Sequence, residues 1–133
     1  MKYWDILNKT QPVAVASVEG DQPRLRMMTL IMMENRLFLA TGSKDAKTRQ
    51  WAQNPKLECM YLLSDERGNG YLRITGTVRR VGSVSLKHSV AEHARFIYQY
   101  WQDADSPDYV LYEIEVSQWR YLKPGMDTEE VYS

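Results

Sequence analysis

Three cations gather near the start of a predicted short helix, where their type and spacing suit the binding of an anion. Residues 41–55 read TGSKDAKTRQWAQNP, so Lys44, Lys47 and Arg49 follow a strand-like run and precede the terminating Asn54-Pro55. The positive end of a helix repels cations, whereas its free N–H groups attract anions. The segment therefore indicates an anion site, with solvated surface lysines as the simpler alternative on spacing alone.

The groups that could meet such an anion include a hydroxyl as well as the cations. Ser43 or Asp45 can cap the helix, which places Lys47 within its first turn or so. Backbone N–H groups, the Ser43 hydroxyl and the Lys47 ammonium group would then converge on one point.

Arg26 is a further cation whose position favours binding chemistry. It lies in residues 24–33, a nearly continuous apolar run that predicts a strand with apolar side chains on both faces. A buried guanidinium is costly without a partner, so Arg26 should meet a carboxylate or a phosphate. An exposed strand start is the alternative. Arg26 and Lys47 together would form a two-cation pocket suited to a phosphate monoester.

The elements that must position these cations are mostly short strands. Alternation and β-branched residues predict strands at residues 13–18, 24–33, 37–41, 57–63, 71–81 and 109–116, the fifth of them interrupted by Gly76. Apolar spacing predicts helices at residues 2–9, 45–53 and 87–101. A polar loop is expected at residues 64–70 and a loose acidic tail after Pro124. Short strands joined by hairpins favour an antiparallel barrel or sandwich over a parallel α/β sheet.

Composition narrows the classes of protein to which the chain can belong. The length of the chain predicts one domain over residues 1–133. The 17 basic and 17 acidic residues give no net charge, and this balance argues against nucleic acid or an acidic membrane as a partner. The first residues are too polar for a secretory signal and no apolar run could span a bilayer, so a cytoplasmic location is expected. Cys59 stands alone, and His88 and His93 are five apart, so no metal site is expected.

Three stretches together resemble a known family. PRLRMMTLIMMENRLFLATGSKDAKTRQWAQNPKLECMYLL resembles the core of the pyridoxamine 5'-phosphate oxidase-like, FMN-binding split-barrel family, and YLRITGTVRRV and DSPDYVLYEIEV are similar to its fifth and last strands. The likeness covers roughly residues 10–118. It implies a mainly β fold, a six-stranded antiparallel split β-barrel with peripheral helices.

The resemblance also implies a cofactor and a site. Arg26 and Lys47 match the family residues that hold the flavin phosphate. The segments beside the flavin match Met27, Met28, Thr29, Ala40 and Thr41, with Ser43 and Tyr71 at neighbouring positions. In the family the FMN lies between two subunits, which implies a homodimer with some aromatic residues and an apolar strand face at the contact.

Departures from the family pattern limit the expected activity. The region SQWRYLKPGMD has no histidine where the vitamin B6 oxidases carry Arg-x-His, so the closer likeness is to the short, general-stress-type branch. We expect an FMN-dependent oxidoreductase that passes electrons between a reduced nicotinamide or similar donor and a small-molecule acceptor. The alternative is a flavin-binding carrier, sensor or stress-response protein without turnover. No side chain stands out as an acid or base, and FAD, a deazaflavin or haem could replace FMN.

Overall fold

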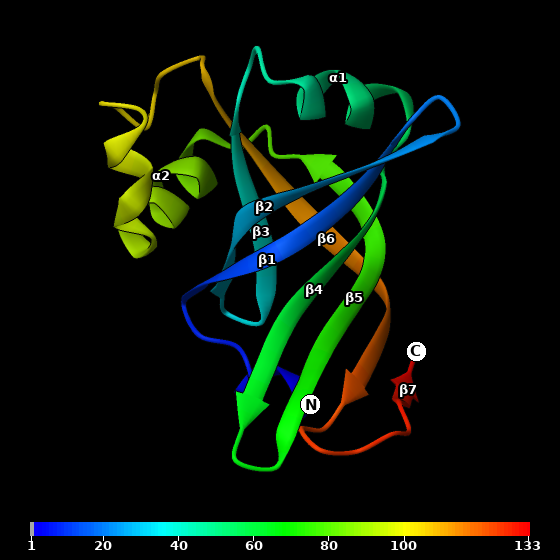
Figure 1. The fold of residues 1–133 in the computed structure, drawn as a ribbon. Helices are drawn as coiled ribbons and strands as arrows, with labels where there is room; N and C mark the ends of the chain where they lie inside the picture. The colour runs from blue at the N-terminus through cyan, green and yellow to red at the C-terminus, as the bar shows by residue number, and fades with distance from the viewer. Residues whose placement is uncertain (1) are drawn as a thin grey trace.

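The chain forms one antiparallel sheet that curls into a barrel, as the computed structural model of residues 2–133 shows (Figure 1). The strand order is β3-β2-β1-β4-β5-β6-β7, and an additional pairing of β3 with β6 closes the ring. The strands are β1 (Thr10–Glu19), β2 (Gln22–Met33), β3 (Arg36–Gly42), β4 (Lys56–Asp65), β5 (Gly68–Arg80), β6 (Tyr109–Leu122) and β7 (Glu130–Tyr132). The predicted barrel of six strands is thus confirmed, and β7 is added outside the ring.

Tight turns set the register of the first two hairpins. β1 and β2 pair continuously from Thr10↔Ile31 to Glu19↔Gln22, as the predicted hairpin requires. Glu34 and Asn35 join β2 to β3 with φ angles of 53° and 57°. Two positive φ angles in a two-residue loop are typical of the turn whose twist matches that of paired strands.

The barrel is split between β2 and β3. These two strands pair only from Ile31↔Phe38 to Met33↔Arg36, after which β3 pairs with β6 as far as Gly42↔Tyr109. Among the described residues, the rest of β2 therefore pairs with β1 on one side and has no strand on the other. This open edge is where a ligand can reach the backbone of the sheet.

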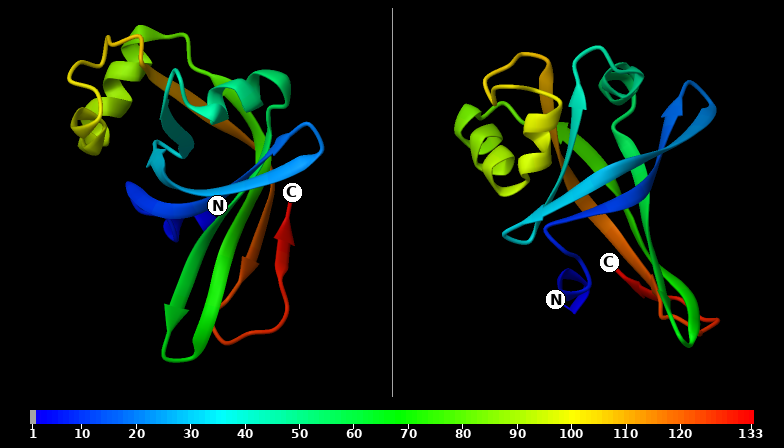
Figure 2. Two further views of the ribbon diagram at one scale, coloured as in Figure 1. Left: turned by 45° about the horizontal axis from the view of Figure 1, so that its top comes forward. Right: turned by 60° about the vertical axis from the view of Figure 1, so that its left-hand side comes forward.

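Helices cover the barrel at two places (Figures 1 and 2). The helix α1 (Ala46–Gln53) follows β3 and lies across the end of the barrel. There Trp51 packs edge-on against Tyr112 of β6, with 4.9 Å between the ring centroids. The region predicted as one helix over residues 87–101 is instead α2 (Val84–His93) followed by the 3-10 helix η2 (Arg95–Gln99). The chain turns at Ala94, whose φ and ψ are −116° and 78°.

Two apolar clusters form the core. The larger one fills the barrel and includes Val15, Leu30 and Ile74, none of which is exposed. The smaller one joins α2 and η2 to the outer face of the barrel through Val90, Ile97 and others. Val90 and Ile97 of the predicted helix at residues 87–101 are therefore both buried, although the helix is interrupted.

Three local predictions were wrong in extent. The polar loop at residues 64–70 is mostly strand, because β4 and β5 continue pairing to Asp65↔Gly68. The tail after Pro124 is not loose, because β7 pairs with β6 at Trp119–Tyr121. The helix at residues 2–9 shortens to the 3-10 helix η1 (Lys2–Asp5).

The predicted break at Gly76 was wrong, because β5 runs through Gly76 without interruption; instead, its register against β6 shifts between Thr75 and Gly76. No helix within residues 2–133 is long and apolar enough to cross a membrane.

Candidate functional site

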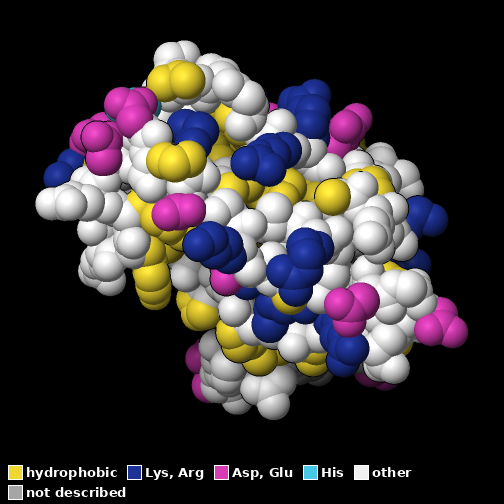
Figure 3. All heavy atoms as spheres, turned by 90° about the horizontal axis from the view of Figure 1, so that it is seen from above, with side chains coloured by type: hydrophobic (Ala, Val, Ile, Leu, Met, Phe, Trp, Pro, Cys, Tyr) yellow, Lys and Arg dark blue, Asp and Glu magenta, His cyan; other side chains and the backbone are white. Residues whose placement is uncertain are grey.

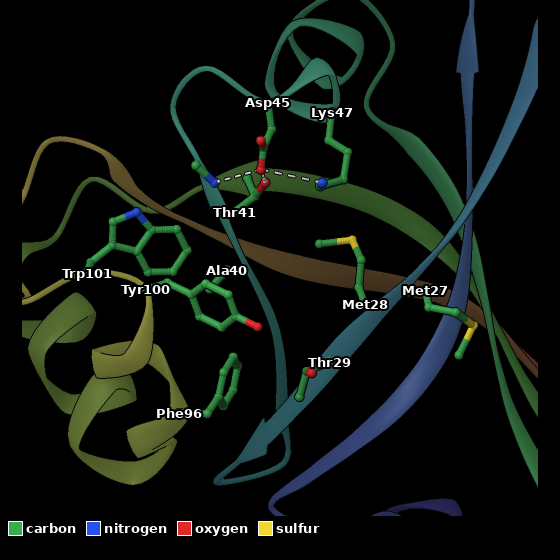
Figure 4. Close-up of a pocket in the computed structure, with 11 residues that line it drawn as sticks. Met27, Met28, Thr29, Ala40, Thr41, Asp45, Lys47, Phe96, Tyr100 and Trp101 are labelled. Atoms are coloured by element: carbon green, nitrogen blue, oxygen red, sulfur yellow. Dashed lines mark hydrogen bonds and ion pairs between the residues drawn. The ribbon is translucent and has the colours of Figure 1, made fainter.

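A pocket of about 250 Å³ opens at the split of the barrel (Figure 4). Strands β2 and β3 form its two long sides, α1 supplies a charged pair, and η2 with the residues after it supplies aromatic rings. Its lining consists of Met27, Met28, Thr29, Ala40, Thr41, Gly42, Asp45, Lys47, Phe96, Tyr100 and Trp101. Six of the nine predicted site residues are in this set: Met27, Met28, Thr29, Ala40, Thr41 and Lys47.

The backbone of β2 offers hydrogen-bonding groups to this pocket. The Met32 N–H donates to the Lys9 carbonyl at 2.9 Å, which points the backbone groups of Met32 toward β1. Alternate residues of an antiparallel strand point their backbone groups in opposite directions. The N–H and C=O groups of Met27 and Thr29 therefore point into the split, where they can meet the polar edge of a planar ligand.

Asp45 organises the α1 side of the pocket. Its Oδ2 accepts hydrogen bonds from Thr41 Oγ1 at 2.7 Å and the Gly42 N–H at 3.0 Å, and it lies 3.5 Å from Lys47 Nζ. The Thr41 hydrogen bond, followed by that of Gly42, holds the pKa of Asp45 below its usual range. Asp45 occupies the N-cap position without a side-chain cap, because its carboxylate turns back toward β3.

Arg26 lies beside α1 without an acidic partner. Its Nη1 donates to Ser17 Oγ at 2.8 Å and its Nη2 donates to Gln50 Oε1 at 3.1 Å. Both partners are buried and neutral, and no ion pair within residues 2–133 includes Arg26. Partial burial, followed by the charge of Arg24, lowers the pKa of Arg26. A carboxylate, one of the two partners predicted for this guanidinium, is thus not supplied by the described chain.

The two predicted phosphate ligands border the same face of α1. Arg26 touches Gln50, and Lys47 precedes Gln50 by three residues in the helix. Residues three apart lie on one face of a helix, roughly 5–6 Å from each other between Cβ atoms. Arg26 does not itself line the pocket, so an anion bound by both cations would lie at the end of the pocket nearest α1.

The basic character of this end is visible from above, where Lys and Arg side chains gather near the centre of the face (Figure 3). Hydrophobic side chains lie between them on the same face. A negatively charged ligand approaching from this side meets a favourable local potential despite the zero net charge of the chain.

Two predicted site residues lie elsewhere in the subunit. Ser43 lies near the pocket but donates to Asp108 Oδ1 at 2.8 Å and lines a separate hollow. Tyr71 donates to Glu129 and pairs with Leu122 of β6, eleven positions from Leu111, the partner of Ala40. Strands β1 and β4 lie between β5, which carries Tyr71, and β2, and Tyr71 does not line the pocket.

The aromatic side of the pocket was missed in the sequence. Trp101 stacks on the buried Tyr109 at 5.4 Å between ring centroids, and Tyr100 packs against Trp101 at 5.7 Å and Phe96 at 6.4 Å. The dense aromatic run in residues 96–101 is the one sequence signal that could have indicated this side of the pocket.

Comparisons with known proteins agree with this architecture. A family model described as pyridoxamine 5'-phosphate oxidase matches residues 2–123. A search of curated proteins by sequence finds no match.

Three solved structures illustrate the similarity in fold. General Stress Protein 26 from Bacillus anthracis str. Sterne is 19% identical with a TM-score of 0.78, covering 99% of this chain and 98% of its own. A putative pyridoxamine 5'-phosphate oxidase from Listeria innocua is 29% identical with a TM-score of 0.70, and the match covers 84% of this chain and 88% of the Listeria chain. A heme binding protein from Mycobacterium smegmatis is 16% identical with a TM-score of 0.77, and the match covers 94% of this chain and 53% of the Mycobacterium chain.

Proposed function

Since the chain belongs to the pyridoxamine 5'-phosphate oxidase family, we propose that it is a flavoprotein that binds FMN at the split of its barrel. The observation that carries the proposal is the positive charge of Arg26, whose guanidinium donates to the neutral Ser17 and Gln50 and borders the same face of α1 as Lys47. A phosphate placed there would receive a bidentate fork from the guanidinium and a point charge from the ammonium group.

The rest of the pocket fits the remainder of FMN. The flavin ring is flat, has polar atoms along one edge and is apolar elsewhere. The backbone groups of Met27 and Thr29 point into the split and suit the polar edge, while Met28 and Ala40 suit the apolar surface. These residues would hold and orient the ring and limit the access of water to it.

When bound, FMN supplies the capacity to accept and release electrons, and the chain's own residues supply binding and environment. Asp45 and Lys47 are the titratable groups that line the described pocket apart from Tyr100, and they contact each other. Electron transfer between a reduced nicotinamide or similar donor and a small acceptor would therefore rely on the flavin and not on a side-chain acid or base.

A second subunit would complete the site. Leu25 and Met27 lie on the face of β2 that is open at the split, with 74% and 64% of each residue exposed. Large apolar side chains that share an exposed face favour association with another surface. In the proposed homodimer, Tyr71, which does not line the pocket of its own chain, could join the flavin from the partner subunit.

Titration of the purified protein with FMN tests the proposal. Flavin fluorescence should be quenched at one FMN per chain, and the melting temperature should rise with the FMN concentration. FAD and haem, titrated in parallel, should bind more weakly. Absence of any change with FMN, or preferential binding of haem, would reject the proposal. Bound flavin that no nicotinamide donor reduces would favour the carrier or sensor role over turnover.

A further inference from the structure

A second hollow of about 340 Å³ adjoins the proposed flavin pocket and shares three residues with it. Thr29, Phe96 and Tyr100 line both spaces, so the two hollows meet at the aromatic side of the pocket. Thr10, Pro12 and Gln99 complete the second space together with the buried Gln11. We refer to this space as the neutral hollow.

Within the described residues 2–133, none that lines the neutral hollow is charged. The charges of the adjoining pocket, Asp45 at the N-cap of α1 and Lys47 in its first turn, lie on the other side of the pocket from the aromatic rings (Figure 4). They lie 3.5 Å apart and offset each other, and Lys47 is assigned to the flavin phosphate. A negatively charged group in the neutral hollow would therefore lose water without gaining a cation.

The aromatic rings between the two spaces are held in place but leave one ring uncovered. Trp101 is fixed by stacking on the buried Tyr109 at 5.4 Å, and Phe96 meets Tyr100 edge-on at 6.4 Å. Tyr100 nevertheless remains 70% exposed, and within residues 2–133 its hydroxyl makes no hydrogen bond. An exposed ring supported by other rings is a suitable surface for stacking a flat ligand.

We infer that the neutral hollow and its aromatic side bind an uncharged planar aromatic ring as the substrate of the flavin site. The inference rests on the proposed function, because the flavin would form the opposite side of the substrate space. Thr10, Thr29 and Gln99 supply neutral hydrogen-bonding groups that can orient a ring substituent. A substrate carrying a phosphate is disfavoured, since this side of the site has no cation for it.

Two probes with the same ring system test the inference. The FMN-loaded protein is titrated calorimetrically with 2-naphthol, which is uncharged at neutral pH, and with 2-naphthyl phosphate. We expect 2-naphthol to bind at least about tenfold more tightly, because only the phosphate ester must desolvate a charge. In the FMN-loaded protein, Tyr100→Ala should weaken 2-naphthol binding by about tenfold. Tyr132→Ala, which removes another half-exposed ring far from the site, serves as the matched control.

The outcomes separate this inference from the proposed function. If FMN binds but the phosphate ester binds as tightly as 2-naphthol, the inference is overturned and the flavin site stands. Unchanged 2-naphthol binding in Tyr100→Ala overturns it as well. If FMN itself does not bind, both proposals fail together.

Discussion

The guanidinium of Arg26 donates from Nη2 to Oε1 of Gln50 at 3.1 Å, so a partly buried positive charge meets a neutral amide. Ser17 completes a closed set of contacts, because it accepts from Arg26 at 2.8 Å and donates to the same Gln50 oxygen at 2.6 Å. Neutral partners orient the guanidinium without offsetting its charge. The charge is thereby kept available for an anion that comes from outside the chain.

Gln50→Glu tests this role of the neutral amide. The new carboxylate would pair with Arg26 and repel the flavin phosphate, so FMN affinity should fall by about tenfold. The free energy of unfolding without FMN should change by no more than about 1 kcal/mol, since the ion pair offsets the cost of burying the carboxylate. Fluorescence titration and urea denaturation measure the two quantities.

Gln53→Glu provides the control for that substitution. Gln53 is exposed in the last turn of the same helix, so its replacement adds the same charge without a contact to Arg26. FMN affinity should stay within about twofold of the unmodified protein. Equal losses in both variants would show that only the net charge of α1 matters.

Asp45→Asn should make stability less dependent on pH in the acid range. The pKa of Asp45 is lowered in the folded state, so its carboxylate stabilises the fold above its unfolded pKa of about 3.9 and this contribution is lost as the pH falls through the folded value. Half of the Asp45 side chain is exposed, so screening by solvent limits the contribution of its carboxylate to the free energy of unfolding at pH 7 to less than about 1 kcal/mol. Urea denaturation gives the free energy of unfolding of both proteins at pH 7 and below pH 3. The unmodified protein should be the more stable one at pH 7, and this difference should disappear below pH 3. A difference of the same size at both pH values would contradict the prediction.

Gly76→Ala should destabilise the barrel where the register between β5 and β6 shifts. An added Cβ would lie 2.2 Å from the Glu115 carbonyl oxygen, a backbone atom that cannot move without disturbing β6. We expect a loss of about 1–3 kcal/mol in the free energy of unfolding. Gly82→Ala is the control, because nothing lies within 4 Å of the added atom. Similar stability of the two variants would show that β6 adjusts freely.

Leu25→Glu should dissociate the proposed homodimer. Leu25 is 74% exposed on β2 and does not line the pocket, so a charge there would oppose burial at a subunit contact without touching the site in its own chain. Light scattering should show a dimer for the unmodified protein and a monomer for the variant. Val84→Glu, on an exposed position of α2, should remain dimeric. A monomeric unmodified protein would refute the shared site.

The strands and the phosphate-site candidates could be predicted from local signals. Apolar runs and turn residues mark the strands, and Arg26 and Lys47 stand out as cations in or next to apolar segments. The break at Ala94 could not be predicted, because the spacing of Val90, Ala94 and Ile97 is the same whether the helix continues or tightens into a 3-10 turn.

Contacts between distant segments account for the remaining differences. The C-terminal tail is ordered by Glu129, which accepts from Tyr71 and from Arg73 Nη1 at 3.0 Å, and by pairing with β6. No local pattern in an acidic tail specifies those partners. Likewise, Asp108 draws Ser43 away from the pocket, and a sequence separation of 65 residues conceals that contact.

Comparison of FMN with riboflavin tests the central claim most directly, because the two ligands differ only in the phosphate. The dissociation constants of both are measured for the unmodified protein, for Arg26→Ala with Lys47→Ala, and for Arg24→Ala with Lys44→Ala as a control of equal charge. The account predicts that FMN binds the unmodified protein and the control about a hundredfold more tightly than riboflavin, and that this preference collapses to about threefold or less in the Arg26 and Lys47 variant. A preference for FMN that survives the loss of both Arg26 and Lys47 would contradict the account.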